Sequence, residues 1–145
     1  MHRVEKTLQV LIGAFMRGKL DHHQPCSCAV GNLLLQSNPI NMTDRNGVKD
    51  FQECWTDAVV RSQVTPRSCE LFAPTNYSIE EMRHIEAKFE KRIDGEMYFN
   101  SANDPDSFKG LSAVFDLLVN DLDKDYFESR PAIQVRGEEV LVGVG

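Results

Sequence analysis

Apolar residues recur at intervals of three and four along the first half of the chain, which is the spacing of amphipathic helices. Residues 2–17 carry one such stripe, and Gly18 follows it in the position of a C-terminal cap. A second helix is predicted over residues 27–36, with Ser27 as its cap. It is apolar around most of its circumference, so we expect neighbouring elements to bury it on several sides. A third helix is predicted over residues 48–62, and two prolines mark residues 63–76 as irregular. The inward stripe of the third helix comprises Phe51, Cys54, Trp55, Ala58 and Val59.

The strongest local signal in the chain begins a fourth helix. Ser78 and Glu81 have the spacing of a capping box, in which each side chain bonds the backbone amide of the other residue. A narrow apolar seam follows. Charged residues that include Glu86 and Glu90 cover the remaining circumference, so we expect this helix to lie on the surface.

A fifth helix is predicted to start at Asp104 and Pro105, which pair a helix cap with a proline in the first turn. Its apolar stripe is very regular, which predicts a position at the centre of the fold beside the fourth helix. The stripe comprises Phe108, Leu111, Val114, Phe115, Leu118 and Leu122. Three of these residues are expected to be almost fully buried, namely Leu111, Phe115 and Leu118.

The C-terminal segment has a different pattern, because six branched apolar residues fall within residues 133–144, on both sides of a glycine-containing turn. We therefore predict an all-α fold of about five helices around a single core in residues 1–130, followed by a small β-hairpin or tail in residues 131–145. An isolated hairpin is marginally stable in water. It would dock on the helices, pair with another chain or stay mobile.

A chain of 145 residues has the length of one ordinary domain. The net charge of −6 argues against nucleic acid or an anionic membrane as the main partner. Residues 1–75 hold eight basic and seven acidic residues, whereas residues 76–145 hold eight and fifteen, so the acidity belongs to the second half. No apolar run approaches the length of a membrane span, and four sparse cysteines predict a reduced, cytoplasmic protein.

Histidine and cysteine side chains gather in one short stretch, where His22, His23, Cys26 and Cys28 offer four ligands of the types that zinc takes. Their spacing is poor, because structural zinc sites bring ligand pairs together from separate elements. Another cysteine, Cys54 or Cys69, would have to complete such a site. In the alternative interpretation Cys28 is a small buried residue, Cys26 is a loop thiol, and both histidines are solvated.

A thiol-dependent reaction is a second way to use this stretch. A cysteine at a helix N-terminus has a lowered pKa, and a neighbouring histidine can serve as its base. Cys26 and Cys28 stand in that position, with His22 and His23 nearby in sequence. Nothing in the sequence supplies an orienting residue, an oxyanion hole or a substrate site.

Several segments are familiar from another group of proteins. The run from Cys28 to Leu33, the Tyr77–Phe89 region and the run from Gly110 to Leu118 together resemble small uncharacterised helical proteins of Bacteroidetes-type bacteria and their phages. The resemblance spans about residues 5–122. It implies a bacterial, cytoplasmic, helical protein, and it assigns no catalytic or binding residue.

The sequence therefore favours a non-enzymatic protein-interaction or accessory module, with a mobile-element origin in view of the phage resemblance. It would bind a protein partner or a second copy of itself through a helical face or an added β-edge, without a cofactor or catalytic residue. The alternative is a metal- or thiol-dependent protein that uses Cys26, Cys28, His22 and His23, with zinc as the metal.

Overall fold

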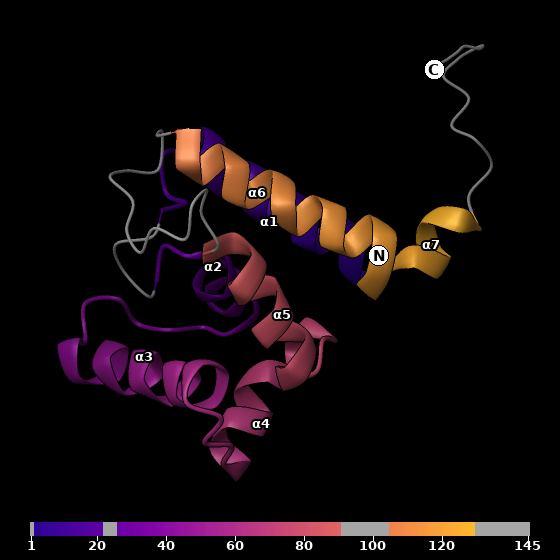
Figure 1. Cartoon of the computed structure of the whole chain (residues 1–145). Coiled ribbons are helices and arrows are strands. Elements are labelled where there is room, and N and C mark those ends of the chain that lie inside the picture. Colours follow the sequence, from indigo (N-terminus) through magenta and orange to yellow (C-terminus); the bar gives the residue numbers. More distant parts are fainter. Residues whose placement is uncertain (1, 22–25, 91–104, 130–145) are drawn as a thin grey trace. The chain divides into compact units, whose positions relative to one another are not determined.

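The computed structural model describes residues 2–21, 26–90 and 105–129 (Figure 1). These residues form helices, turns and loops but no strand, which confirms the prediction of an all-α protein. The β-hairpin predicted for residues 131–145 lies outside the described residues. None of the described helices has the length and apolar character that a membrane crossing needs.

The chain divides into two compact units, residues 1–115 and 116–145. The first unit holds, in chain order, α1 (Arg3–Met16), α2 (Ala29–Ser37), α3 (Arg45–Val60), α4 (Pro66–Phe72), the 3-10 turn η1 (Ala73–Thr75), α5 (Ile79–Glu90) and most of α6 (Pro105–Leu117). The second unit continues from α6 with a π-helical turn, η3 (Leu118–Leu122), and the short α7 (Lys124–Glu128).

Two helix starts differ from the sequence prediction, and a side-chain cap explains each. The carboxylate of Asp44 accepts a hydrogen bond from the amide of Gly47, so α3 begins three residues earlier than predicted. The cap of α2 is Cys28 rather than Ser27, with Sγ accepting from the amide of Gly31 at 3.3 Å. A thiol therefore occupies a position that a hydroxyl or a carboxylate usually fills.

The short helix α4 lies in residues 63–76, the segment that the two prolines marked as irregular. Thr65 and Ser68 form a capping box in which each side chain accepts from the backbone amide of the other residue. Pro66 occupies the first turn, where a missing N–H costs nothing. The prediction of an irregular segment was wrong because this proline starts a helix instead of breaking one.

The capping box predicted for α5 is confirmed. The amide of Ser78 donates to the carboxylate of Glu81 at 2.8 Å, and the amide of Glu81 donates to the Ser78 hydroxyl at 3.0 Å. Glu81 also receives two hydrogen bonds from the guanidinium of Arg3, which lies 4.0 Å from the ring centre of Tyr77. This cap therefore also fastens the N-terminus of α1 to the N-terminus of α5.

Helix α2 is surrounded by other elements, as its all-round apolar pattern predicted. It packs against α1, α5 and η1, and its buried residues are Ala29, Val30, Gly31, Leu33 and Leu34. Helix α3 packs against α4 and α5, and it buries Phe51 and Trp55. Trp55, the only tryptophan, is therefore a core residue, as predicted.

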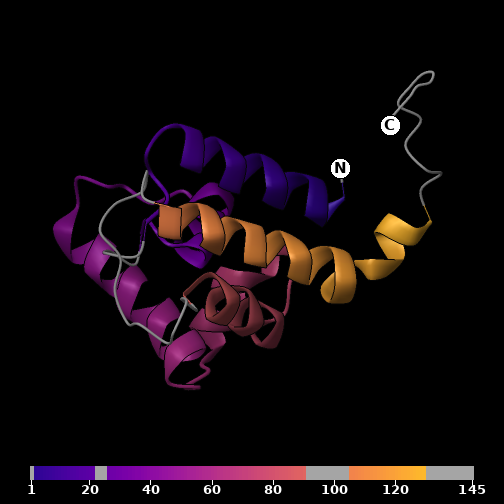
Figure 2. The same cartoon turned by 45° about the horizontal axis from the view of Figure 1, so that its top comes forward.

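Helix α6 turns a different face inward from the one predicted. Within the first unit it runs antiparallel to α1 (Figure 2), and its buried residues there are Ser107, Gly110 and Val114. A Cβ atom on Gly110 would lie 2.8 Å from both the ring and the carbonyl oxygen of Phe89, so α6 approaches α5 through its small residues. The expected burial is confirmed for Leu118, but it is wrong for Phe115, which is exposed, and for Leu111, which is only partly buried.

Candidate functional site

Large apolar side chains gather on the outer face of α1 and α6. The exposed fractions are 48% for Ile12, 77% for Met16, 56% for Phe108 and 44% for Phe115. The half-buried Phe15 connects the two helices, because its ring centre lies 6.0 Å from that of Phe108. We call these five residues the apolar ridge.

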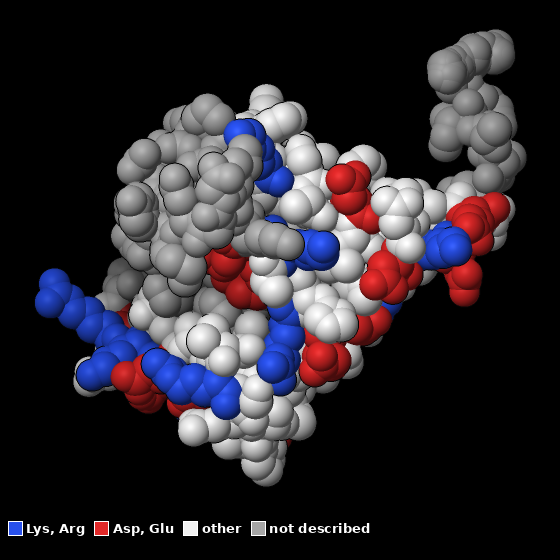
Figure 3. All heavy atoms as spheres, viewed as in Figure 1, with Lys and Arg blue, Asp and Glu red and all other residues white. Residues whose placement is uncertain are grey.

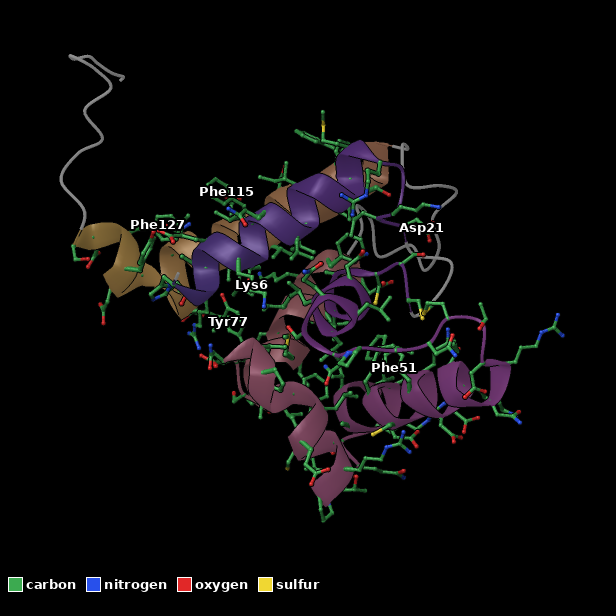
Figure 4. All side chains as sticks on the ribbon, turned by 180° about the vertical axis from the view of Figure 1, so that it is seen from behind. Lys6, Asp21, Phe51, Tyr77, Phe115 and Phe127 are labelled. Carbon is green, nitrogen blue, oxygen red and sulfur yellow. The ribbon has the colours of Figure 1, made fainter. Side chains whose placement is uncertain are left out.

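Helix periodicity places the members of the ridge on common faces. Residues three and four apart are neighbours on a helix surface, so Ile12, Phe15 and Met16 share one face of α1. Phe108 and Phe115 are seven residues apart and share one face of α6. Figure 4 shows Phe115 on the outer side of the α1–α6 pair, whereas Phe51 points into the space between α2 and α3.

Four exposed cations lie on α1, α6 and the turn after α1, but two of them, Lys6 and Arg17, line hollows on the side of α1 that faces α2 and η1, away from the ridge. Lys6, Arg17, Lys19 and Lys109 are exposed, and none has an ion pair among the described residues. The next charged residue along α6, Asp116, is acidic and directly follows Phe115. Elsewhere, the face in Figure 3 shows basic and acidic side chains interspersed over α3 and α5.

A polar cleft of about 390 Å³ borders α1 on the side of α2. Its lining residues are Gln9, Val10, Arg17, Asn32, Leu35 and Gln36. Arg17 is the only charged group among them, and its guanidinium lies beside Gly13, where a Cβ atom would come within 3.0 Å of it. An arginine with amide neighbours suits a carboxylate group, because the guanidinium can donate two parallel hydrogen bonds to its two oxygens.

A buried acid lies at the start of α2, which the sequence did not predict. The carboxylate of Glu86 accepts from the amide of Val30 at 3.4 Å and bonds the side chains of Cys28 and Glu90. Glu86 was expected on the surface of α5, but α5 packs against both α2 and α3. The amides of the first turn of a helix lack partners within the helix, so this carboxyl group satisfies a donor that would otherwise stay unbonded.

Burial favours the uncharged forms of Glu86 and Cys28. Desolvation, followed by the neighbouring Glu90 carboxylate, raises the pKa of Glu86 to about 8. Desolvation, followed by the charge of Glu86, raises the pKa of the Cys28 thiol well above its ordinary value. The lowered pKa expected for a thiol at a helix N-terminus is therefore not found at Cys28, which suits packing better than nucleophilic attack.

The remaining cysteines do not converge with Cys28 on a site. All four cysteines are free thiols, and Sγ of Cys26 accepts from the side-chain amide of Gln52 at 3.1 Å. Cys54 is half-buried on α3, where desolvation raises its pKa, and Cys69 is exposed on α4. Across the described ranges, no three histidine, cysteine or acidic residues are placed to hold a metal ion. His22 and His23 lie outside those ranges, so the zinc site stays a prediction.

Asn32 holds together the chain segments on both sides of residues 22–25. Its side-chain amide donates to the carbonyl oxygens of Lys19, Ser27 and Cys28 at 3.1, 3.1 and 2.9 Å. The backbone amide of Asp21 also donates to the Ser27 carbonyl at 2.8 Å. A single side chain therefore bonds three backbone carbonyl groups.

Comparisons with protein-family models, with curated proteins and with solved structures gave no match. The resemblance to Bacteroidetes-type and phage proteins therefore stays a prediction, and the function has to be inferred from the residues of this chain.

Proposed function

We propose that this chain is a non-enzymatic protein-interaction module that binds its partner through the apolar ridge. The observation that carries the proposal is the orientation of α6, which faces the core with small residues and leaves Phe108 and Phe115 exposed. Single exposed apolar residues are ordinary on protein surfaces. A contiguous group of large ones on two neighbouring helices is typical of an interaction site.

The chemistry of the core also favours binding over catalysis. Cys28 and Glu86 are the titratable groups most strongly perturbed by burial, and they lie where α2 meets α5. A catalytic group needs access to substrate within hydrogen-bonding distance, and these two groups are enclosed by the core. Their hydrogen bonds to the first turn of α2 give them a structural role.

The test is selection of binders from a displayed library of helical peptides, with the full chain as the target. The ridge variant carries Met16→Ser and Phe108→Ser. The matched control carries Val60→Ser and Val64→Ser, which remove two apolar residues that are equally exposed but lie outside the ridge. We expect the selected peptides to bind the wild type and the control variant but not the ridge variant.

Thermal melting followed by circular dichroism checks that each variant is folded. The single substitution Met16→Ser serves as a milder ridge variant, because Met16 is the most exposed member. A selection that yields no peptide, or only peptides that bind the ridge variant as tightly as the wild type, would overturn the proposed function.

A further inference from the structure

We infer that the polar cleft between α1 and α2 binds a small molecule that carries an ammonium group on the carbon atom next to a carboxylate, that is, a free α-amino acid. The cleft is lined by residues of α1 and α2, and none of them belongs to the apolar ridge. The inference is therefore independent of the proposed function. It rests on the lining of the cleft, on an arginine without a partner and on an amide oxygen without a donor.

The cleft has the size of a small-molecule site and a mostly polar lining. Its volume of about 390 Å³ falls within the range of ligand pockets. Val10 and Leu35 are its apolar residues, and the amide side chains of Gln9, Asn32 and Gln36 line most of the rest. A small polar molecule with a short side chain matches this lining better than a hydrocarbon does, because the amide groups would lose their hydration against a hydrocarbon.

Arg17 supplies the group that would bind the carboxylate. It is the only charged residue of the lining, and its guanidinium lies against Gly13. Its side chain has no ion pair or hydrogen bond within the described residues, although Asp21 follows four residues later. An arginine donates two parallel hydrogen bonds to a carboxylate. One guanidinium matches the single charge of a carboxylate more closely than the nearly double charge of a phosphate group.

The side chain of Asn32 supplies an acceptor with a fixed orientation. Its nitrogen donates to the carbonyl oxygens of Lys19, Ser27 and Cys28, and these bonds determine which end of the amide is the oxygen. That oxygen, Oδ1, accepts no hydrogen bond from the described part of the chain and is not buried. Arg17, which lines the same cleft, is the C-cap of α1. Because the C-terminus of a helix carries partial negative charge, this end of the cleft favours a cation beside the carboxylate.

An α-amino acid combines both requirements in one molecule. Its carboxylate suits Arg17, its ammonium group suits the oxygen of Asn32, and the two groups are attached to the same carbon atom. Gln9 and Gln36 have no side-chain hydrogen bond within the described ranges, and an amide can donate to the carboxylate or accept from the ammonium group. A simple carboxylic acid would leave the acceptor of Asn32 unused, and a simple amine would leave Arg17 unused.

The experiment begins with saturation-transfer NMR on the full chain, with the standard L-amino acids tested one at a time at millimolar concentration. Isothermal titration calorimetry then compares the tightest binder with its N-acetyl derivative, which has no ammonium group, and with its amide, which has no carboxylate. We expect each derivative to bind at least about tenfold more weakly, because each loses a charge-assisted hydrogen bond. Arg17→Met should weaken binding by a similar factor, and Arg17→Lys by a smaller one.

The matched control is Lys6→Met, which also removes an exposed cation of α1. Lys6 lines the neighbouring hollow with Tyr77 and not the polar cleft (Figure 4), so this variant should bind the amino acid as tightly as the wild type. Thermal melting checks that each variant is folded.

Four results would each overturn the inference. They are no binding of any amino acid, equal binding of either blocked derivative, unchanged binding by Arg17→Met, and an equal loss in Lys6→Met. Equal binding of the N-acetyl derivative would mean that the cleft recognises a carboxylate alone. None of these results affects the proposed function, because peptide binding to the apolar ridge is measured separately.

Discussion

Replacing Glu86 with glutamine is expected to stabilise the protein at neutral and alkaline pH. The carboxyl group is buried beside Cys28 and Glu90 and accepts from the first turn of α2. In its charged form it loses hydration that the core does not replace. Glutamine keeps the shape and the acceptor oxygen of a protonated glutamic acid, so Glu86→Gln removes the charge and preserves the bond from Val30.

The magnitude follows from the difference in pKa between the folded and unfolded chains. The pKa of Glu86 rises from 4.5 to about 8 in the fold. Between these values the folded chain binds a proton that the unfolded chain lacks, so the free energy of unfolding falls as pH rises. One pKa unit corresponds to about 1.4 kcal/mol, so the loss reaches about 3 kcal/mol at about pH 7. The loss is complete once the pH has risen through the folded pKa.

Another carboxyl group on α5 acts outside this pH window. Partial burial opposes ionisation of Glu81, but its bonds from the Ser78 amide and Arg3 outweigh burial and lower its pKa. The stability from Glu81 is therefore present above its unfolded pKa and is lost only as pH falls below about 4.5. Glu81 therefore does not account for a loss of stability between mildly acidic and mildly alkaline pH, whereas Glu86 predicts one.

The assay is urea unfolding followed by the fluorescence of Trp55, the only tryptophan, which is buried against the same core. Midpoints measured between about pH 5 and about pH 8 give the free energy of unfolding at each pH. The matched control is Glu80→Gln on the same helix. Glu80 is exposed, and its ion pairs among the described residues are with Arg83 and His84 on the surface of α5. Its replacement should therefore change stability by less than about 0.5 kcal/mol at every pH.

The wild type and the Glu80→Gln control should both lose stability as pH rises, and Glu86→Gln should not. A wild-type free energy of unfolding that is constant or rises over this range would refute the reasoning. An equal pH dependence in Glu86→Gln would assign the titration to another group.

Five further substitutions address the packing on which the ridge depends, and urea unfolding measures all of them. Ser78→Ala should cost about 1 kcal/mol by removing the cap of α5. Asn32→Ala should cost about 1–3 kcal/mol, because three carbonyl groups lose their donor. Gly110→Ala should cost about 1–3 kcal/mol by forcing α6 away from α5. Val114→Ala should cost about 2 kcal/mol and Phe115→Ala about 1 kcal/mol, and a larger loss at Phe115 would mean that α6 faces inward as its periodicity predicts.

Local signals in the sequence predicted the fold where a few neighbouring residues decide the structure. The capping box at Ser78 and Glu81 has the predicted bonds, because its geometry involves only four consecutive residues. The all-round apolar pattern of residues 27–36 correctly predicted a buried helix. Pro66 was misread because proline both breaks helices and starts them, and only the Thr65–Ser68 pair distinguishes the two roles.

The candidate site could not be predicted from the sequence because it depends on contacts between distant segments. Periodicity shows that α6 has an apolar stripe but not which face meets its neighbours. Close approach of Gly110 to Phe89 selects the small face, and nothing in the sequence joins these two positions. In the same way, the sequence indicated a surface position for Glu86. The structure shows that Glu86 is the hydrogen-bond partner of a backbone amide at the start of α2.

The orientation of α6 has a cost that a purely structural helix would avoid. Full burial of a phenylalanine side chain contributes about 1.5–3 kcal/mol, yet Phe108 is 56% and Phe115 44% exposed, while Ser107, Gly110 and Val114 face the core. Turning the helix to bury both would replace the close contact at Gly110 with large side chains, which needs a wider gap between α5 and α6. The tight packing of the small face thus keeps Phe108 and Phe115 on the surface. A partner that covers them would recover part of the missing hydrophobic free energy, which favours a binding surface over a packing defect.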